Sequence, residues 1–399
     1  MGGVWWIGGF NPRLLAKWVL LRREASGMDA FGGGHNMREI NVLIGNNLRI
    51  ERESVGMSRT SMANALNIKR TVLDEYEAGN LEFEEDFLEL VADVLRCSIS
   101  VFFKEHVPLN NVRFRSKKSL NSREAILNTC SEHLQDFLCL EEFLGRRTTS
   151  NLDKIRENCF SKDIAQYALN VRKYLGLSIT EPVVDVCDIA ERCGVKLVPF
   201  NSPEVSVSGL SAYDDKTGPV LFLNTNSKLS VEHKRFSFAH ELGHLFIHVG
   251  DYRNECDSEE SVREKEANTF ASNFLMPEEG FVTGIRNTRG FPIYSVVLRI
   301  KNNFGISCTS VLYRMNQHYG RPFDAAFAIA FKRETGKAFQ RTEEPFPMSE
   351  VDFGTQKLKA MVRDAIEKDL ITVSRGAEIL KCSVSEMRRI MSEWVSWHE

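Results

Sequence analysis

Apolar residues recur at helical spacing through residues 37–104, and polar breaks divide them into four short segments. One face of the first segment is formed by Ile40, Leu43, Ile44 and Leu48. Ser58 precedes a second segment, Lys69 opens a third that ends before Gly79, and an apolar stretch over 87–95 makes a fourth. Spacing of i, i+3 and i+4 is typical of one buried helix face, so the pattern predicts an all-α domain with two short helices joined by a tight turn.

A longer apolar stripe follows in residues 121–145, within a connecting region that we place at 105–160. Ser122 stands before this stripe and is a suitable N-cap. A stripe of this length needs a partner surface. We therefore expect a linker helix that packs one domain onto another, or one copy of the chain onto a second copy, which allows a homodimer.

Residues 161–320 mix the two periodicities. The segments 205–213 and 219–224 alternate well enough to predict two antiparallel strands. Helical patterns surround them, and a helical pair at 295–301 and 310–319 is joined by a Gly-Ile-Ser turn. These elements predict an α+β domain. An edge strand of its sheet could hold an extended substrate by main-chain pairing.

The last part of the chain, 321–399, begins with a strand-like apolar run at 323–331 and a loop rich in Gly and Pro. Helical patterns resume from about Thr355 to Trp397. The expected fold class is therefore multi-domain: an all-α helix-turn-helix domain, an α+β domain, and a C-terminal strand and helical module.

Composition is consistent with several globular domains, since 399 residues are 43% hydrophobic and carry a net charge of −3. Nine cysteines without a CxxC pair favour a reducing cytoplasm over a disulfide framework. No apolar run reaches the roughly 20 residues that span a bilayer. Residues 1–36 are expected to be an extension outside the fold, with Met28 or Met37 as alternative starts; a short amphipathic helix that contacts a membrane or a partner is the other interpretation.

The strongest chemical signal is His240-Glu241-Leu242-Gly243-His244, inside a helical run that starts near Ser230. Residues at i and i+4 share a helix face, so His240 and His244 can direct two imidazoles at one metal ion. Zinc suits two such nitrogens, a carboxylate and one open position. Glu241 stands beside the first ligand, where it can act as the general base.

A third ligand is expected from the amphipathic helix over 259–276. Glu266 borders its apolar stripe and is the favoured candidate, with Glu259, Glu260 and Glu264 as rivals. His248 extends the motif by one more turn, and we interpret it as a supporting or packing residue. His233 and His318 remain candidates for stabilising an oxyanion.

These residues resemble the ImmA/IrrE family of metallopeptidases. The resemblance covers about 160–320 and rests on the HELGH run, Glu266-Ala267-Asn268, Phe270-Ala271 and Leu275-Met276-Pro277. It implies a zincin-like fold in which His240, His244 and Glu266 bind zinc and Glu241 is the catalytic base. It also implies cleavage of a helix-turn-helix repressor or another regulatory protein in a stress or mobile-element response.

The N-terminal helices resemble the XRE (Cro/C1-type) helix-turn-helix family. The resemblance rests on Ile44-Gly45, Met57-Ser58 with Ala63 and Leu66, and Glu77-Ala78-Gly79. It implies a recognition helix over 69–75 and a double-stranded DNA contact within 58–77. The implied contact residues are Arg59, Lys69, Arg70 and Thr71.

Charge counts against DNA binding, because residues 38–103 hold seven basic and twelve acidic side chains, a net −5. The same helices could instead dock a protein. The leading hypothesis is a zinc endopeptidase fused to a helix-turn-helix. The alternatives are a DNA-binding regulator whose zincin-like domain senses a ligand or metal without proteolysis, and an interaction scaffold with structural zinc.

Overall fold

The computed structural model describes residues 37–104, 109, 112–113, 120–249, 260–349 and 356–395, so the expected extension at 1–36 lies outside the described residues. The chain divides into two compact units, which are treated separately. Unit 1 comprises 1–108, 118–146 and 360–399, and unit 2 comprises 109–117 and 147–359.

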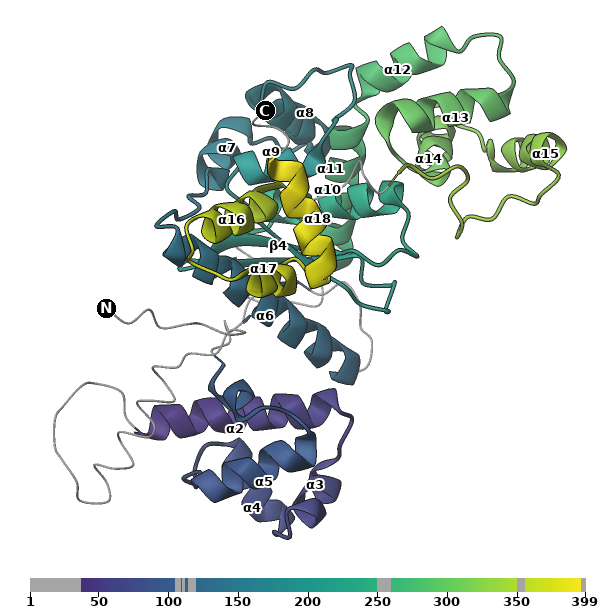
Figure 1. The fold of residues 1–399 in the computed structure, drawn as a ribbon. Coiled ribbons are helices and arrows are strands. Elements are labelled where there is room, and N and C mark those ends of the chain that lie inside the picture. The colour runs from purple at the N-terminus through teal and green to yellow at the C-terminus, as the bar shows by residue number, and fades with distance from the viewer. Residues whose placement is uncertain are drawn as a thin grey trace. The chain divides into compact units, whose positions relative to one another are not determined.

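Unit 1 begins with the expected cluster of short helices (Figure 1). They are α2 (Met37–Ser54), α3 (Arg59–Ala65), α4 (Arg70–Glu77) and α5 (Glu85–Leu95), followed by the 3₁₀ helix η1 (Ile99–Phe103). The side chain of Ser58 accepts a hydrogen bond from the backbone N–H of Ser61 and caps α3. Gly45 lets α2 approach the end of α4, since a Cβ there would lie 2.3 Å from the carbonyl oxygen of Tyr76. The four expected helices are confirmed.

The remaining helices of unit 1 are α6 (Leu120–Phe143), most of α16 (Gln356–Glu367), α17 (Val373–Ile379) and α18 (Val384–Val395). Helix α6 begins two residues before Ser122, so the expected N-cap lies inside the helix. Asp136 of α6 accepts a hydrogen bond from Arg375 of α17. Asp136 also lies 3.9 Å from the ammonium of Lys381, so ion pairs join the linker helix to the C-terminal helices.

Unit 2 contains one small sheet of four strands in the order β1-β3-β4-β2. Its strands are β1 (Val112–Arg113), β2 (Lys196–Phe200), β3 (Gly209–Asp214) and β4 (Gly218–Asn224). Strands β3 and β4 are antiparallel, with Leu210 opposite Phe222, which confirms the two expected strands. Strand β2 pairs parallel to β4.

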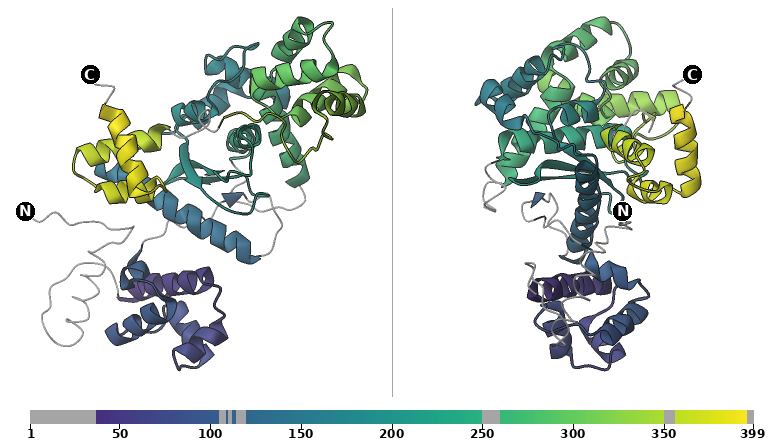
Figure 2. Two further views of the ribbon diagram at one scale, coloured as in Figure 1. Left: turned by 45° about the vertical axis from the view of Figure 1, so that its right-hand side comes forward. Right: turned by 60° about the vertical axis from the view of Figure 1, so that its left-hand side comes forward.

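Nine helices of unit 2 accompany this sheet in the described ranges. They are α7 (Leu152–Cys159), α8 (Ile164–Tyr174), α9 (Val186–Arg192), α10 (Val231–Ile247), α11 (Glu260–Leu275), α12 (Glu278–Asn287), α13 (Ile293–Phe304), α14 (Cys308–Tyr319) and α15 (Asp324–Thr335). Helix α10 contacts β3 and β4 on one side and α11 on another, and α11 also packs on α8 (Figure 2). Helix α10 is therefore the central element of the unit.

The expectation of a strand at 323–331 is wrong, because this run forms α15. Alanine supplies four residues of the segment and has the highest helix propensity. Phe327, Ala330 and Phe331 are buried at i, i+3 and i+4, while Ile329 is 73% exposed. That spacing forms one buried helix face, and it is hidden in the sequence by apolar residues on the exposed face.

Two general expectations can be compared with the described residues. None of the helices in these ranges is both long enough and apolar enough to cross a membrane. The eight cysteines that lie in the described ranges are all free thiols.

A buried ion pair links α10, α13 and the segment before residue 349. Lys301 and Glu232 are both fully buried, with Nζ 2.5 Å from Oε1. The Lys301 ammonium also donates to the carbonyl oxygen of Phe346, and the backbone N–H of Met348 donates to Glu232. These contacts fasten the loop after α15 to the helix that carries the HExxH motif.

We expect Lys301→Met to destabilise the protein by about 3–5 kcal/mol, because it leaves the Glu232 carboxylate buried without its cation. Chemical denaturation followed by circular dichroism measures the loss. The double variant Lys301→Met, Glu232→Leu should recover much of it, while Arg333→Met, in an exposed pair with Glu334, should change stability by less than about 1 kcal/mol. A double variant as unstable as the single one would show that the pair is not the cause.

Candidate metal centre

Helix α10 presents the HExxH residues from an almost fully buried position. The helix begins after Ser230, whose side chain accepts a hydrogen bond from the backbone N–H of His233. His240 and His244 are each 1% exposed and lie one turn apart on the face toward α11. Such burial keeps water away from both rings except at the site itself.

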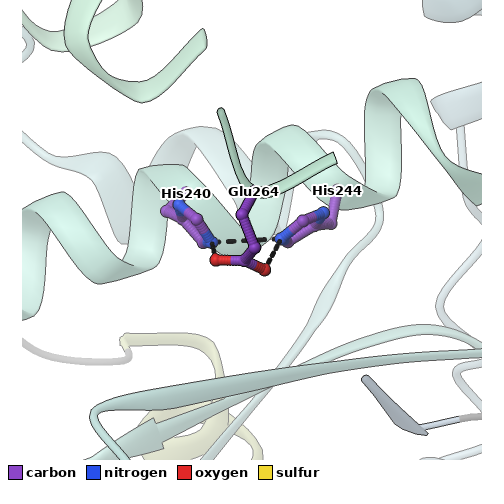
Figure 3. Close-up of side chains that lie close together, drawn as sticks. All are labelled: His240, His244 and Glu264. Carbon is purple, nitrogen blue, oxygen red and sulfur yellow. Dashed lines mark hydrogen bonds and ion pairs between the residues drawn. The ribbon is translucent and has the colours of Figure 1, made fainter. Parts of the chain in front are cut away.

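The two imidazoles and one carboxylate meet at a single point (Figure 3). The Nε2 atoms of His240 and His244 lie 3.0 Å apart. Glu264 brings Oε2 to 3.4 Å from the first of them and Oε1 to 3.2 Å from the second. Donor atoms that share one tetrahedral zinc ion at its usual bond lengths are about 3.3 Å apart, so the spacing fits one small metal ion.

The third member of this cluster differs from the residue that the sequence favoured. Glu266 lies away from the two Nε2 atoms, and its Oε2 is 2.8 Å from Nε2 of His248. Residues two apart on a helix are separated by about 200° around its axis, so Glu264 and Glu266 cannot both face the same point. Glu264 lies four residues before Asn268, whose side chain contacts His240. The i, i+4 relation places Glu264 and Asn268 on the same face of α11, which is the face toward His240.

Contact between α10 and α11 is close because of Gly243. A Cβ at this position would lie 3.0 Å from Cδ1 of Phe270 and 3.3 Å from its Cβ. Phe270 is fully buried against the helix. The glycine inside the motif therefore lets α11 come near enough to place Glu264 beside the histidines.

The charge state of Glu264 suits a ligand. Burial by itself would raise the pKa of this carboxyl group, but hydrogen bonds and charge from His240 and His244 outweigh that effect and lower the pKa well below its ordinary value. The carboxylate is thus ionised at neutral pH, as metal binding requires.

Glu241 points from α10 toward the sheet. Its side chain is 5% exposed, and its Oε2 accepts a hydrogen bond of 2.5 Å from the hydroxyl of Ser211 on β3. A Cβ on Gly209 would lie 3.4 Å from Cγ of Glu241, an ordinary van der Waals contact, so β3 passes directly beside this side chain. Sequence reasoning did not find Ser211, since only the tertiary packing of β3 on α10 brings it to the carboxylate.

Both histidines of the cluster have a partner on the ring nitrogen that faces away from it. Nδ1 of His240 lies 3.0 Å from Oδ1 of Asn268, and Nδ1 of His244 lies 2.9 Å from Nδ1 of His248. His318 lies apart from this centre, 3.0 Å from a carboxylate oxygen of Glu278. His233 is an exposed residue of the first turn of α10.

The edge of β3 beside the site is paired. Val112 and Arg113 of β1 lie antiparallel to Ala212 and Ser211. The backbone of β1 therefore runs next to the residue that holds Glu241. An extended substrate that used this part of the edge would compete with β1.

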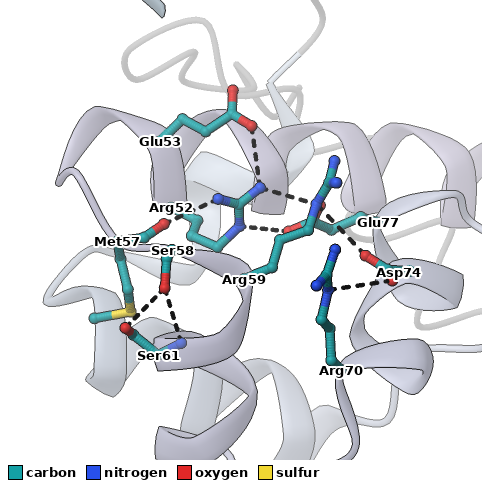
Figure 4. A network of polar contacts seen from close by, with 9 residues as sticks. All are labelled: Arg52, Glu53, Met57, Ser58, Arg59, Ser61, Arg70, Asp74 and Glu77. Atoms are coloured by element: carbon teal, nitrogen blue, oxygen red, sulfur yellow. Dashed lines mark hydrogen bonds and ion pairs between the residues drawn. The ribbon is translucent and has the colours of Figure 1, made fainter.

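The residues expected to contact DNA lie around α3 and α4 of unit 1. Figure 4 shows two of them, Arg59 and Arg70. Lys69, Arg70 and Thr71 are exposed side by side where α4 begins. Arg59 is also exposed, but its guanidinium lies 3.2 Å from Glu77 and 3.5 Å from Asp74. Arg70 lies 4.0 Å from Asp74. Acidic neighbours thus engage two of the four expected contact residues.

Comparison with known proteins gives one family match. Residues 190–316 match the family model of the IrrE N-terminal-like domain, Peptidase_M78, and the N-terminal helices lie outside that match. A search of the curated proteins found no match. The matched range contains β2, β3, β4, α10 and α11, and with them every residue of the cluster. The chain therefore contains an IrrE N-terminal-like domain whose candidate metal site is formed by His240, His244 and Glu264.

Proposed function

We propose that this domain is a zinc-dependent endopeptidase. The proposal is carried by the cluster of two buried imidazole Nε2 atoms and the Glu264 carboxylate oxygens, whose distances from one another are 3.0–3.4 Å. Glu241 directly follows His240, the first residue of this cluster, in the sequence. Two nitrogens and one oxygen are the donor set of catalytic zinc sites, in which the fourth position stays open. The family match to a peptidase domain supports the same assignment.

Zinc held by His240, His244 and Glu264 would supply Lewis acidity, lowering the pKa of a coordinated water and polarising the scissile carbonyl. Glu241 then serves as the general base at its carboxylate, accepting a proton there and returning it to the leaving amine. Ser211 donates its hydroxyl hydrogen to Oε2 of Glu241. This bond fixes the orientation of the carboxylate that takes part in proton transfer.

The proposed substrate is a regulatory protein, such as a transcriptional repressor, as the resemblance to the ImmA/IrrE family implies. An extended segment that paired with β3 beside Glu241 would displace β1, which pairs there with Ala212 and Ser211. The alternative is a DNA-binding regulator in which the domain senses a ligand or metal. The presence of Glu241 beside the ligand set favours proteolysis over sensing alone.

We expect Glu241→Gln to lower cleavage of a co-expressed regulator by about 10²–10⁴-fold while the protein retains its zinc, because the amide keeps the shape of the carboxylate but cannot accept the proton. Metal analysis of the purified protein and gel analysis of candidate repressors measure the two quantities. Glu279→Gln, an exposed change on α12, is the matched control. Full activity of the Glu241 variant would refute proteolysis and favour the sensor.

We propose DNA binding as a second function, carried by unit 1. The specific observation in its favour is the row Lys69, Arg70 and Thr71, exposed together at the N-terminal end of α4. Side chains at the start of a recognition helix reach base edges and phosphates. The ion pairs of Asp74 with Arg59 and Arg70 work against it, because phosphate contacts must replace them.

Lys69→Ala with Arg70→Ala should weaken DNA binding and lower the salt slope by about 2, if each side chain neutralises one phosphate. Asp74→Asn should have the opposite effect, since it removes the acidic partner of Arg70 and one of the two acidic partners of Arg59. Fluorescence anisotropy with labelled duplex DNA at several salt concentrations measures both, and Arg49→Ala on α2 is the control. A DNA affinity that depends neither on salt concentration nor on the substitutions at Lys69, Arg70 and Asp74 would exclude this surface as the DNA-binding site.

A further inference from the structure

We propose that His248 and Glu266 are positioning residues of the metal centre, which hold the His244 ring in the tautomer and orientation that bind the ion. The inference rests on the zinc site of the proposed function, but it concerns metal binding rather than cleavage. It gives a role to His248, the last residue of the HExxHxxxH pattern, and to Glu266, the first residue of Glu-Ala-Asn. Both lie outside the cluster of His240, His244 and Glu264.

A continuous chain of contacts carries the argument. Nδ1 of His244 lies 2.9 Å from Nδ1 of His248, and Nε2 of His248 lies 2.8 Å from Oε2 of Glu266. His244 is 1% exposed and His248 is 5% exposed. The contact between the two histidines is thus shielded from water, which makes it stronger than the same contact at the surface. The contact of His248 with Glu266 is part-buried, since the Glu266 side chain is 36% exposed.

Proton placement along this chain is determined by the metal. Nε2 of His244 must be unprotonated to bind an ion, so the proton of the neutral ring is on Nδ1. That N–H donates to Nδ1 of His248. His248 then carries its own proton on Nε2 and donates it to Glu266. Each ring has one donor and one acceptor in use, and the negative charge at the end of the chain increases the basicity of the ligand nitrogen.

The second ligand has an equivalent but weaker support. Nδ1 of His240 lies 3.0 Å from Oδ1 of Asn268, an uncharged acceptor. Asn268, Glu266 and Glu264 all belong to α11, so one helix supplies a ligand, the outer partner of His240 and the carboxylate that contacts His248. The two acidic residues differ in role because of their angle on the helix: Glu264 faces the ion, and Glu266 faces His248.

The end of α10 explains how His248 reaches this position. The helix ends at Ile247, and His248 is the C-cap residue, with its backbone N–H still bonded to the carbonyl oxygen of His244. The i, i+4 relation places its ring next to that of His244. It is therefore fixed by α10 on one side and by α11 on the other.

The test is the zinc affinity of purified protein, measured by competition with a chromophoric chelator. His248→Leu removes the acceptor for His244 and should weaken zinc binding by about 10–100-fold. His248→Gln offers an amide oxygen and an amide N–H to the same two partners, so it should restore most of the affinity. A merely structural residue would show no such rescue.

Glu266 is tested in the same way. Glu266→Leu should weaken zinc binding, and Glu266→Gln, which still accepts from His248, should bind nearly as tightly as wild type. Since Glu266 acts through His248, the double variant with both leucines should bind no more weakly than His248→Leu alone. Glu264→Gln, a change of a direct ligand, should lose more affinity than any of these.

Cobalt gives a second readout that does not depend on activity. The visible spectrum of the Co²⁺ protein at saturation should change in His248→Leu and remain as in wild type in His248→Gln. His318→Leu on α14 is the matched control, and the melting temperature of each metal-free variant tests its folding. A leucine variant that unfolds is replaced in the comparison by the two glutamine variants and Glu264→Gln.

Unchanged affinity and cobalt spectrum in His248→Leu and Glu266→Leu would overturn the proposal. So would a Glu266→Gln variant that loses zinc as fully as Glu264→Gln, because Glu266 would then be a direct ligand. A wild-type protein that binds zinc and cleaves nothing would refute the peptidase assignment alone. The ranking of affinities among the variants would in that case still support the positioning role.

Discussion

Close packing of α11 on α10 is the contact on which the candidate site depends. Gly243 removes the side chain that would separate the helices, and the buried ring of Phe270 takes its place. Across this interface lie the three members of the metal cluster, the contact of His240 with Asn268 and the contact of His248 with Glu266. A shift of one helix by a fraction of an ångström would change all of these distances at once, because interiors this dense do not deform locally.

The faces of α10 have different tasks. Toward α11 it presents the two imidazoles, and toward the sheet it presents Glu241, about 100° around the axis from His240. Strand β3 completes the second face with Ser211. Glu241 is thus held by β3, whereas the metal cluster is completed by α11. The two parts of the site are therefore positioned by separate packing contacts.

Local pattern was sufficient for the parts of the site that depend on one helix. The i, i+4 spacing places His240 and His244 on one helix face whatever surrounds them, and in the structure their Nε2 atoms lie 3.0 Å apart. Whether Glu264 or Glu266 faces the histidines depends on the rotation of α11 about its own axis. The apolar pattern of this helix does not define that rotation closely enough to choose between the two acids. Ser211 could not be found from the pattern, because its contact with Glu241 joins a strand to a helix thirty residues later.

Elsewhere the pattern failed for a different reason. In α15 the exposed Ile329 made a helical segment look like a continuous apolar strand. The charge of Arg59 can be predicted from its residue type, but its partners cannot. The contacts with Asp74 and Glu77 reduce the charge that Arg59 offers to a phosphate. Both cases concern the surface, where burial does not force a pattern on the residues.

Strand β1 has a practical consequence for anyone who wishes to study the domain with the metal cluster in isolation. The family match begins at residue 190, yet the sheet that holds Ser211 includes residues 112 and 113, and the core of unit 2 includes Leu152, Ile155 and Val171. A fragment cut at the edge of the match would leave an open strand edge and an uncovered apolar surface, both of which promote aggregation. Truncation boundaries for this protein should therefore follow its hydrogen bonds and core rather than its sequence similarity.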